Sequence, residues 1–127
     1  MDKNKTIMVV DDNPDIITIV KTILEGKGYS VLSASGGAEL LNMLKGQKPD
    51  LIILDIMMPE MDGLEVLSRL KAVSETATIP VILLTAKVQY EDVLGGYKLG
   101  ADYYITKPFT STQLVNGINL LLGEVKS

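Results

Sequence analysis

The chain has 127 residues, of which 46% are hydrophobic and 22% charged, and it contains no cysteine and no histidine. These values predict one folded domain spanning residues 1–127, and a net charge of −4 with scattered basic residues argues against binding to nucleic acid or to a membrane. The missing residue types exclude disulfides, the usual zinc sites and histidine-dependent triads, which leaves carboxylates, hydroxyls and lysines for chemistry.

The first element is a continuous apolar run, Ile7 to Val10, which is typical of a strand buried on both faces. This run is shorter than the core of a signal peptide, so we expect a cytoplasmic protein. A helix follows, because Asn13 and Pro14 have the pattern of an N-cap and a first helical residue. Its apolar stripe ends before the glycines at 26 and 28.

The middle of the chain repeats this alternation of strand and helix. Residues 29–34 predict an edge strand, and the Gly36-Gly37 pair opens a second helix with a leucine stripe. The apolar run from Leu51 to Leu54 predicts another buried strand, and a third helix follows Gly63. Strands that alternate with helices in this way favour a parallel sheet.

The last third of the chain adds two more units of the same kind. Strands are expected at residues 81–84 and 103–105, and helices at about residues 90–99 and after Thr110. Five strands in strict alternation with five helices predict a single parallel sheet with helices on both faces. We find no repeat, low-complexity linker or second domain in the sequence.

Polar residues lie at the ends of four of the predicted strands. They are Asp11 and Asp12 after the first, Asp55 after the third, Thr85 at the end of the fourth, where Ala86 follows it, and Lys107 shortly after the fifth. Function in an open parallel sheet gathers beyond the carboxyl ends of the strands, so these residues should share one rim. An isolated aspartate at such a place is usually a cap or turn former, but the joint pattern argues against that reading.

Three carboxylates at one rim repel one another unless a cation lies among them. An all-oxygen site without histidine suits Mg²⁺ or Mn²⁺, and Mg²⁺ prefers one or two carboxylates together with water and phosphate oxygens. Asp11 or Asp12 with Asp55 would therefore hold an ion and leave coordination positions for a phosphoryl group. The glycine-rich loop of a nucleotide site is missing after the first strand.

The sequence at these strand ends resembles the receiver domain of two-component response regulators, in order and along essentially the whole chain. The matching segments are Val9 to Asp12, Leu54 to Gly63, Leu84 to Ala86, and Lys107-Pro108. The resemblance implies an α/β fold, a single doubly wound (βα)5 domain with flavodoxin-like strand order 2-1-3-4-5. It also implies a signalling switch in a phosphorelay rather than a turnover enzyme, with a histidine kinase or histidine phosphotransfer protein as the phosphoryl donor.

The family resemblance further assigns roles to individual residues. Asp55 is the implied phosphoacceptor, and the implied Mg²⁺ ligands are Asp11, Asp12, Asp55 and the backbone carbonyl of Met57. The Thr85 hydroxyl and the Ala86 amide are implied to contact phosphoryl oxygens, and Lys107 is implied to neutralise another. The peptide bond between Lys107 and Pro108 is expected to be cis.

The resemblance places the output on the face formed by the fourth helix, fifth strand and fifth helix. Five of the six aromatic residues lie in the C-terminal third, and Tyr104 holds the position of an aromatic that turns inward when Thr85 moves toward the phosphoryl group. The alternative role for Tyr104 is ordinary packing at a strand edge. The downstream partner or output domain is not specified, and a phosphorylation-dependent homodimer is a further expectation.

The resemblance implies that two residues set the lifetime of the phosphoryl group, Met57 and Lys87. Neither side chain accepts a proton from water at neutral pH, which predicts slow self-dephosphorylation. Met57 also argues against a phosphatase of the haloacid dehalogenase type, which needs a second aspartate at that position. The remaining alternative function is a protein-interaction module that never needs phosphate. The chain is expected to be either complete or a receiver cut from a longer protein.

Overall fold

A computed structural model of the chain describes residues 5–86 and 90–123. Its five strands form one parallel sheet in the order β2-β1-β3-β4-β5, which confirms the predicted fold and strand order. The strands are β1 (Thr6–Val10), β2 (Ser30–Ala34), β3 (Leu51–Leu54), β4 (Val81–Thr85) and β5 (Tyr103–Thr106).

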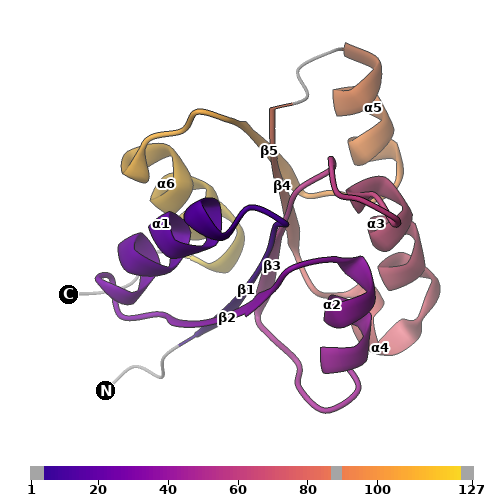
Figure 1. Ribbon diagram of the computed structural model, residues 1–127, viewed down its shortest axis with the longest axis horizontal. Coiled ribbons are helices and arrows are strands. Elements are labelled where there is room, and N and C mark those ends of the chain that lie inside the picture. Colours follow the sequence, from indigo (N-terminus) through magenta and orange to yellow (C-terminus); the bar gives the residue numbers. More distant parts are fainter. Residues whose placement is uncertain (1–4, 87–89, 124–127) are drawn as a thin grey trace.

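Helices cover both faces of this sheet (Figure 1). They are α1 (Pro14–Glu25), α2 (Gly37–Met43), α3 (Gly63–Ala72), α4 (Ser74–Ala77), α5 (Tyr90–Lys98) and α6 (Ser111–Leu122). In Figure 1, α1 and α6 lie together on one face, and α2, α3 and α5 lie on the other. The helices that the sequence predicts as fourth and fifth are therefore α5 and α6.

Two separate hydrophobic cores, one on each face, explain why the strand sequences are apolar without alternation. In β3, Ile52 and Leu54 belong to the core beneath α2 and α3, whereas Leu51 and Ile53 belong to the core beneath α1 and α6. Every residue of β3 and of β4 is buried, because successive side chains point to opposite covered faces. The edge strand β2 is buried only at Ala34.

The short helix α4 departs from the predicted strict alternation of five strands with five helices. It lies between α3 and β4, and α3 ends because Val73 adopts an extended conformation. The hydroxyl of Thr76 donates to the carbonyl of Leu70 at 2.6 Å, and the ammonium of Lys71 donates to the carbonyl of Ala77 at 3.0 Å. Helix α4 buries no side chain, so it has no apolar stripe that would predict it.

Side-chain caps fix three of the helices that begin at the carboxyl edge of the sheet, α1, α3 and α6, whereas α2 begins after Gly36 without one. Asn13 accepts from the amide of Asp15 at the start of α1, and Asp62 accepts from the amide of Glu65 at the start of α3. Thr110 forms a reciprocal capping box at the start of α6. Each cap satisfies amides that lack partners within the helix, so the loops that lead into these three helices are anchored where the helix begins.

Candidate functional site

The loops that follow the strands are held to the sheet by backbone hydrogen bonds at its carboxyl edge. The amide of Asp55 donates to the carbonyl of Val10 at 3.0 Å, and the amide of Lys107 donates to the carbonyl of Thr85 at 2.9 Å. These bonds extend the ladders β1–β3 and β4–β5 past the ends of the strands. The predicted shared rim therefore follows from parallel strands that end at the same level.

Asp11, Asp12 and Asp55 lie together on this rim, and one carboxylate oxygen from each lies within 4.8 Å of the others. Asp11 and Asp55 are 2% and 5% exposed, while Asp12 is open to solvent. Burying two like charges so close together is unfavourable unless a cation compensates them. This donor set of hard oxygen atoms fits Mg²⁺, with Asp12 on the solvent side of the cluster.

Lys107 supplies a cation to the two buried carboxylates. Its Nζ lies 2.7 Å from Asp11 Oδ2 and 3.3 Å from Asp55 Oδ2, and its side chain is 18% exposed. Burial alone lowers the pKa of Lys107, but its hydrogen bonds and charge interactions with Asp11 and Asp55 outweigh burial and raise the pKa above its usual value. The lysine is therefore charged throughout the physiological range.

The environment of Asp11 opposes its ionisation. Burial raises the pKa of Asp11, with a smaller contribution in the same direction from Asp55, while the hydrogen bonds from Lys107 and from the Asn13 amide act in the opposite direction. The Asn13 amide donates to Asp11 Oδ1 at 2.9 Å. The sequence pattern indicates only a helix cap at Asn13, because the contact of its backbone amide with Asp11 has no signature in the side chains.

The cis peptide bond expected between Lys107 and Pro108 is present. Thr85 is fully buried at the end of β4, and Ala86 beyond it is exposed. The amide of Met57 donates to Asp55 Oδ1 at 3.2 Å, and the Met57 side chain is 54% exposed. Lys87 lies outside the described residues. The roles of these residues toward a phosphoryl group or a metal stay predictions.

Tyr104 lies in β5 on the side of the sheet that carries α5. Its half-buried ring packs against the core beneath α2 and α3, and the ring of Tyr97 lies 6.5 Å away, centroid to centroid, at an interplanar angle of 39°. This places Tyr104 next to α5, on the predicted output face. Whether it turns upon phosphorylation stays a prediction.

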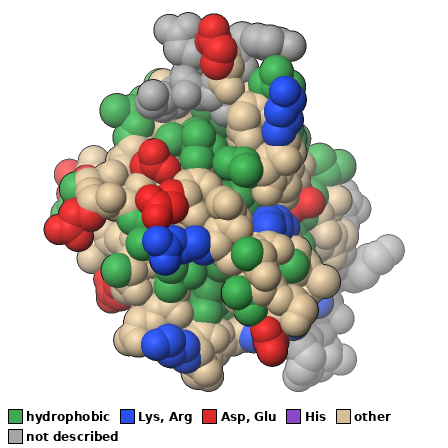
Figure 2. Space-filling view, turned by 90° about the vertical axis from the view of Figure 1, so that its right-hand side faces the viewer, with side chains coloured by type: hydrophobic (Ala, Val, Ile, Leu, Met, Phe, Trp, Pro, Cys, Tyr) green, Lys and Arg blue, Asp and Glu red, His purple; other side chains and the backbone are tan. Residues whose placement is uncertain are grey.

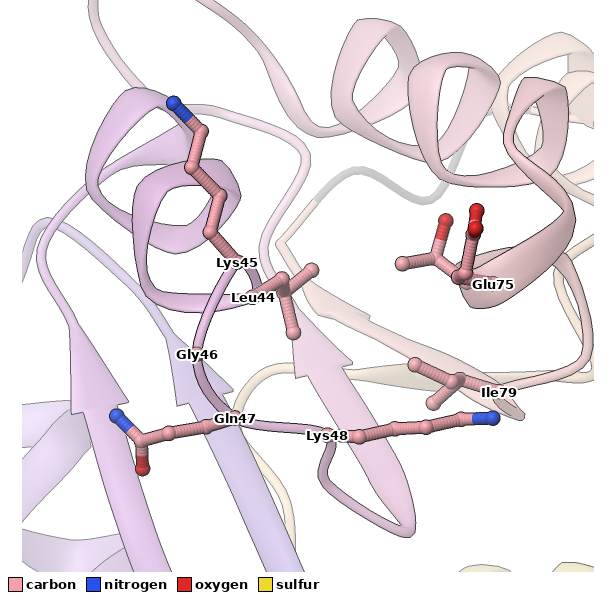
Figure 3. A pocket seen from close by; sticks show the side chains of 8 residues that line it. Leu44, Lys45, Gly46, Gln47, Lys48, Glu75 and Ile79 are labelled. Atoms are coloured by element: carbon pink, nitrogen blue, oxygen red, sulfur yellow. The ribbon is translucent and has the colours of Figure 1, made fainter.

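A pocket of about 230 Å³ lies at the opposite edge of the sheet (Figure 3). It is formed by the loop that leads into β3 and by the segment from α4 to β4, with Leu44 and Ile79 on facing walls and Lys45 directed away. Because both segments precede their strands, the pocket is remote from Asp55. It contributes nothing to the carboxylate cluster.

Basic side chains on the face formed by α2 to α5 lie singly among acidic and apolar ones (Figure 2). A nucleic-acid site would instead present a continuous basic patch. None of the helices within residues 5–86 and 90–123 combines the length and hydrophobicity needed to cross a bilayer.

Comparison with known proteins places the chain among signalling receivers. The family model of the response regulator receiver domain matches residues 7–119. The alkaline phosphatase synthesis transcriptional regulatory protein PhoP of Bacillus subtilis is 42% identical over 119 residues, which are 94% of this chain and 49% of PhoP. The response regulator SaeR of Staphylococcus aureus is 40% identical over 120 residues, again 94% of the chain and 51% of SaeR.

Solved structures share the fold along nearly the whole chain. The chemotaxis protein CheY4 of Vibrio cholerae superposes with a TM-score of 0.90 at 29% identity, covering 94% of this chain and all of that one (100%). The receiver domain of the sensor histidine kinase PA1611 of Pseudomonas aeruginosa, which has a magnesium ion coordinated in its active site cleft, superposes with a TM-score of 0.87 at 26% identity. That match covers 96% of this chain and 100% of the PA1611 chain.

The chain spans about half the length of the curated relatives PhoP and SaeR. The matched part of this chain, residues 7–119, is the receiver domain, and it contains the five-stranded parallel sheet and the acidic rim. Receivers are signalling switches of two-component systems, and the chain belongs to the response regulator receiver domain family.

Proposed function

We propose that Asp55 accepts a phosphoryl group from the phosphohistidine of a sensor kinase or of a histidine phosphotransfer protein. The observation that carries this proposal is the arrangement at the rim, where the buried Asp55 carboxylate adjoins a second acidic group and a shared lysine. A merely structural rim would have no reason to bury Asp11 and Asp55 so close together. Such an arrangement lowers stability and is typical of functional sites.

The proposed step is an in-line displacement at phosphorus. A carboxylate oxygen of Asp55 forms the new O–P bond while the P–N bond to the donor imidazole breaks, and the imidazole nitrogen leaves with the bonding electrons. Lys107 stabilises the negative charge on one equatorial oxygen, and the Thr85 hydroxyl and Ala86 amide donate to the others. Positioning and charge stabilisation supply most of the rate enhancement in this chemistry.

The donor set supports Mg²⁺ as the cofactor, with Mn²⁺ as a substitute. Asp11, Asp12 and Asp55 would hold the ion together with the backbone carbonyl of Met57. When bound, Mg²⁺ compensates the clustered carboxylates and the charge of the phosphoryl oxygens. Lys107 already interacts with Asp11 and Asp55, so it is placed to move between these carboxylates and the phosphoryl product.

The protein catalyses its own phosphorylation and a slow dephosphorylation, and it acts on no separate substrate. Two residues identified from the sequence support slow hydrolysis, Met57 and Lys87, because neither side chain accepts a proton from water at neutral pH. The exposed Met57 side chain borders Asp55 without offering a polar atom that binds water well. The phosphorylated state would then last long enough to be read by a partner.

The proposed readout is the face made by α5, β5 and α6, with Thr85 and Tyr104 as the residues that respond. Exposed apolar side chains on α5, Leu94 and Tyr97, support the binding of a protein partner to this face. A second copy of the chain, bound in a phosphorylation-dependent homodimer, is one such partner. PhoP is a transcriptional regulatory protein by name. By kinship with the response regulators PhoP and SaeR we propose a cytoplasmic location, and any effect on DNA would act through a partner or an output domain.

Phosphorylation by a small donor tests this function without knowledge of the cognate kinase. Acetyl phosphate with Mg²⁺ should modify the protein, and chelation of Mg²⁺ by EDTA should prevent modification. Asp12→Asn should need a higher Mg²⁺ concentration for the same rate, because it removes the solvent-facing carboxylate of the cluster. Modification that proceeds equally well in EDTA would count against the proposal.

A further inference from the structure

Gly63, the first residue of α3, lies against the main chain of the proposed phosphoacceptor. A Cβ atom added to Gly63 would lie 2.1 Å from the carbonyl oxygen of Asp55 and 2.8 Å from its carbonyl carbon. It would also lie 2.8 Å from Cα of Ile56. Non-bonded heavy atoms are stable at about 3.5–4.0 Å, so a side chain at this position would force the two segments apart.

Close approach, and not backbone conformation, is the reason for glycine at this position. The positive-φ glycines are Gly28, Gly100 and Gly123, so the conformation of Gly63 suits any residue. Among the eleven glycines of the sequence, Gly63 is the one whose added Cβ would come within 3.0 Å of main-chain atoms. Main chain cannot rotate away as the tip of a side chain does.

Hydrogen bonds hold the start of α3 to the segment that carries the site. The amide of Gly63 donates to the carbonyl of Ile56 at 2.8 Å, and the amide of Met58 donates to the same oxygen at 3.1 Å. Between these bonds lies Met57, whose amide donates to Asp55 Oδ1. The start of α3 is itself fixed by Asp62, which accepts from the amide of Glu65.

We propose that Gly63 is a positioning residue for phosphoryl transfer. Its bare Cα lets the first turn of α3 pack on the Asp55–Ile56 peptide and so fixes the Asp55 carboxylate and the Met57 carbonyl. This inference rests on the proposed function of Asp55. Displacing the segment by a fraction of an ångström would disturb both the attacking oxygen and the metal ligands.

The test compares Gly63→Ala with Gly117→Ala. The added Cβ of Gly117→Ala would also be crowded, at 3.0 Å from Tyr103, but by side chains beneath α6 on the other face of the sheet. Gly63→Ala should weaken Mg²⁺ binding about tenfold and slow phosphorylation by acetyl phosphate by up to about a hundredfold. Gly117→Ala should keep wild-type values of both. Wild-type behaviour of Gly63→Ala, or equal losses in both variants, would overturn the proposal.

Amide chemical shifts of the metal-free protein separate this proposal from the proposed function. In Gly63→Ala they should change most at residues 55–57, and in Gly117→Ala around residues 103–105. If wild-type protein takes no phosphate, the proposed function fails, while these shifts and the Mg²⁺ titration still decide the role of Gly63. Unchanged shifts at residues 55–57 would contradict it.

If Gly63→Ala does not fold, a second pair of variants tests whether the first turn of α3 positions the segment that carries Asp55. Asp62→Ala removes the cap of α3, whereas Asp62→Asn removes the charge and retains a capping oxygen. Asp62→Ala should bind Mg²⁺ more weakly than Asp62→Asn, because the first turn of α3 loosens on the Asp55–Ile56 peptide. Equal affinities in these two variants would overturn the proposal.

Discussion

Lys107 shares its ammonium between two carboxylates from different strands, at 2.7 Å from Asp11 and 3.3 Å from Asp55. Asp11 follows β1, Asp55 follows β3 and Lys107 follows β5, so the contact joins three strand ends across the rim. In the metal-free protein this lysine is the cation that compensates the buried charges. The same side chain is the proposed ligand of the phosphoryl group.

Lys107→Met should destabilise the metal-free protein by about 2 kcal/mol, somewhat less than the loss of one partner in a fully buried pair. Added Mg²⁺ should shrink this difference, because it compensates the same carboxylates, and the variant should bind Mg²⁺ more tightly than wild type. Urea unfolding with and without Mg²⁺ measures both effects. Lys21→Met, at an exposed position on α1, is the control and should leave stability and Mg²⁺ binding unchanged. A stability loss in Lys107→Met that Mg²⁺ does not reduce would refute this account of the lysine.

Met57→Asn should lose its phosphoryl group about tenfold faster than wild type, because an amide orients the attacking water where a thioether does not. The side chain is 54% exposed, so the substitution should leave folding intact. The decay of the phosphorylated form after removal of the donor measures the rate. Met57→Leu, which is apolar and similar in size, should decay at the wild-type rate. Slower decay in Met57→Asn would show that the predicted hydrolysis mechanism is wrong.

Gly95→Ala should stabilise the protein by up to about 1 kcal/mol, because glycine lowers helix stability and the added Cβ of Gly95 meets nothing within 4 Å. The neighbouring Gly96→Ala should destabilise it, because its Cβ would lie 2.5 Å from Leu83 Cδ1 in the core. Thermal unfolding of the two variants shows directly whether each substitution raises or lowers the stability of the protein. Opposite signs are expected from adjacent positions in one helix, and destabilisation by Gly95→Ala would contradict the open environment described for it.

Glu39 should titrate below its ordinary range, because the amide of Ser35 and then its hydroxyl donate to the carboxylate, which lowers the pKa of Glu39. A lowered pKa means that the ionised form stabilises the fold. That contribution is present above pH 4.5 and is lost as the pH falls through the pKa of the folded state. Carboxyl chemical shifts in an NMR titration measure the pKa of Glu39. Ser35→Ala should raise this pKa only part of the way, since the backbone bond remains, and an unaltered pKa in that variant would exclude the hydroxyl as a cause.

The strand positions and the rim could be predicted because their causes are local in the sequence. Burial on two faces makes β3 and β4 continuously apolar, and parallel strands that end together bring Asp11, Asp55 and Lys107 to one place. The helix α4 could not be predicted in this way, because it buries no side chain. It is held by Thr76 and Lys71 through bonds to main-chain carbonyls.

The finer structure of the site was also beyond the sequence pattern. The family resemblance implies that Lys107 contacts a phosphoryl group, whereas its direct pairing with Asp11 depends on how far the lysine side chain reaches across the rim. The Asn13 amide on Asp11 and the bare Cα of Gly63 against Asp55 are contacts made by main chain. Such contacts leave no trace in charge or hydrophobic periodicity, although Gly63 is visible as a glycine just after a helix cap.

The central claim is that Asp55 is the phosphoacceptor, and intact-mass measurement after incubation with acetyl phosphate and Mg²⁺ tests it most directly. Wild-type protein should gain the mass of one phosphoryl group, and Asp55→Asn, which changes one oxygen of the side chain to nitrogen, should gain none under the same conditions. An unmodified wild type, or equal modification of Asp55→Asn, would contradict the account.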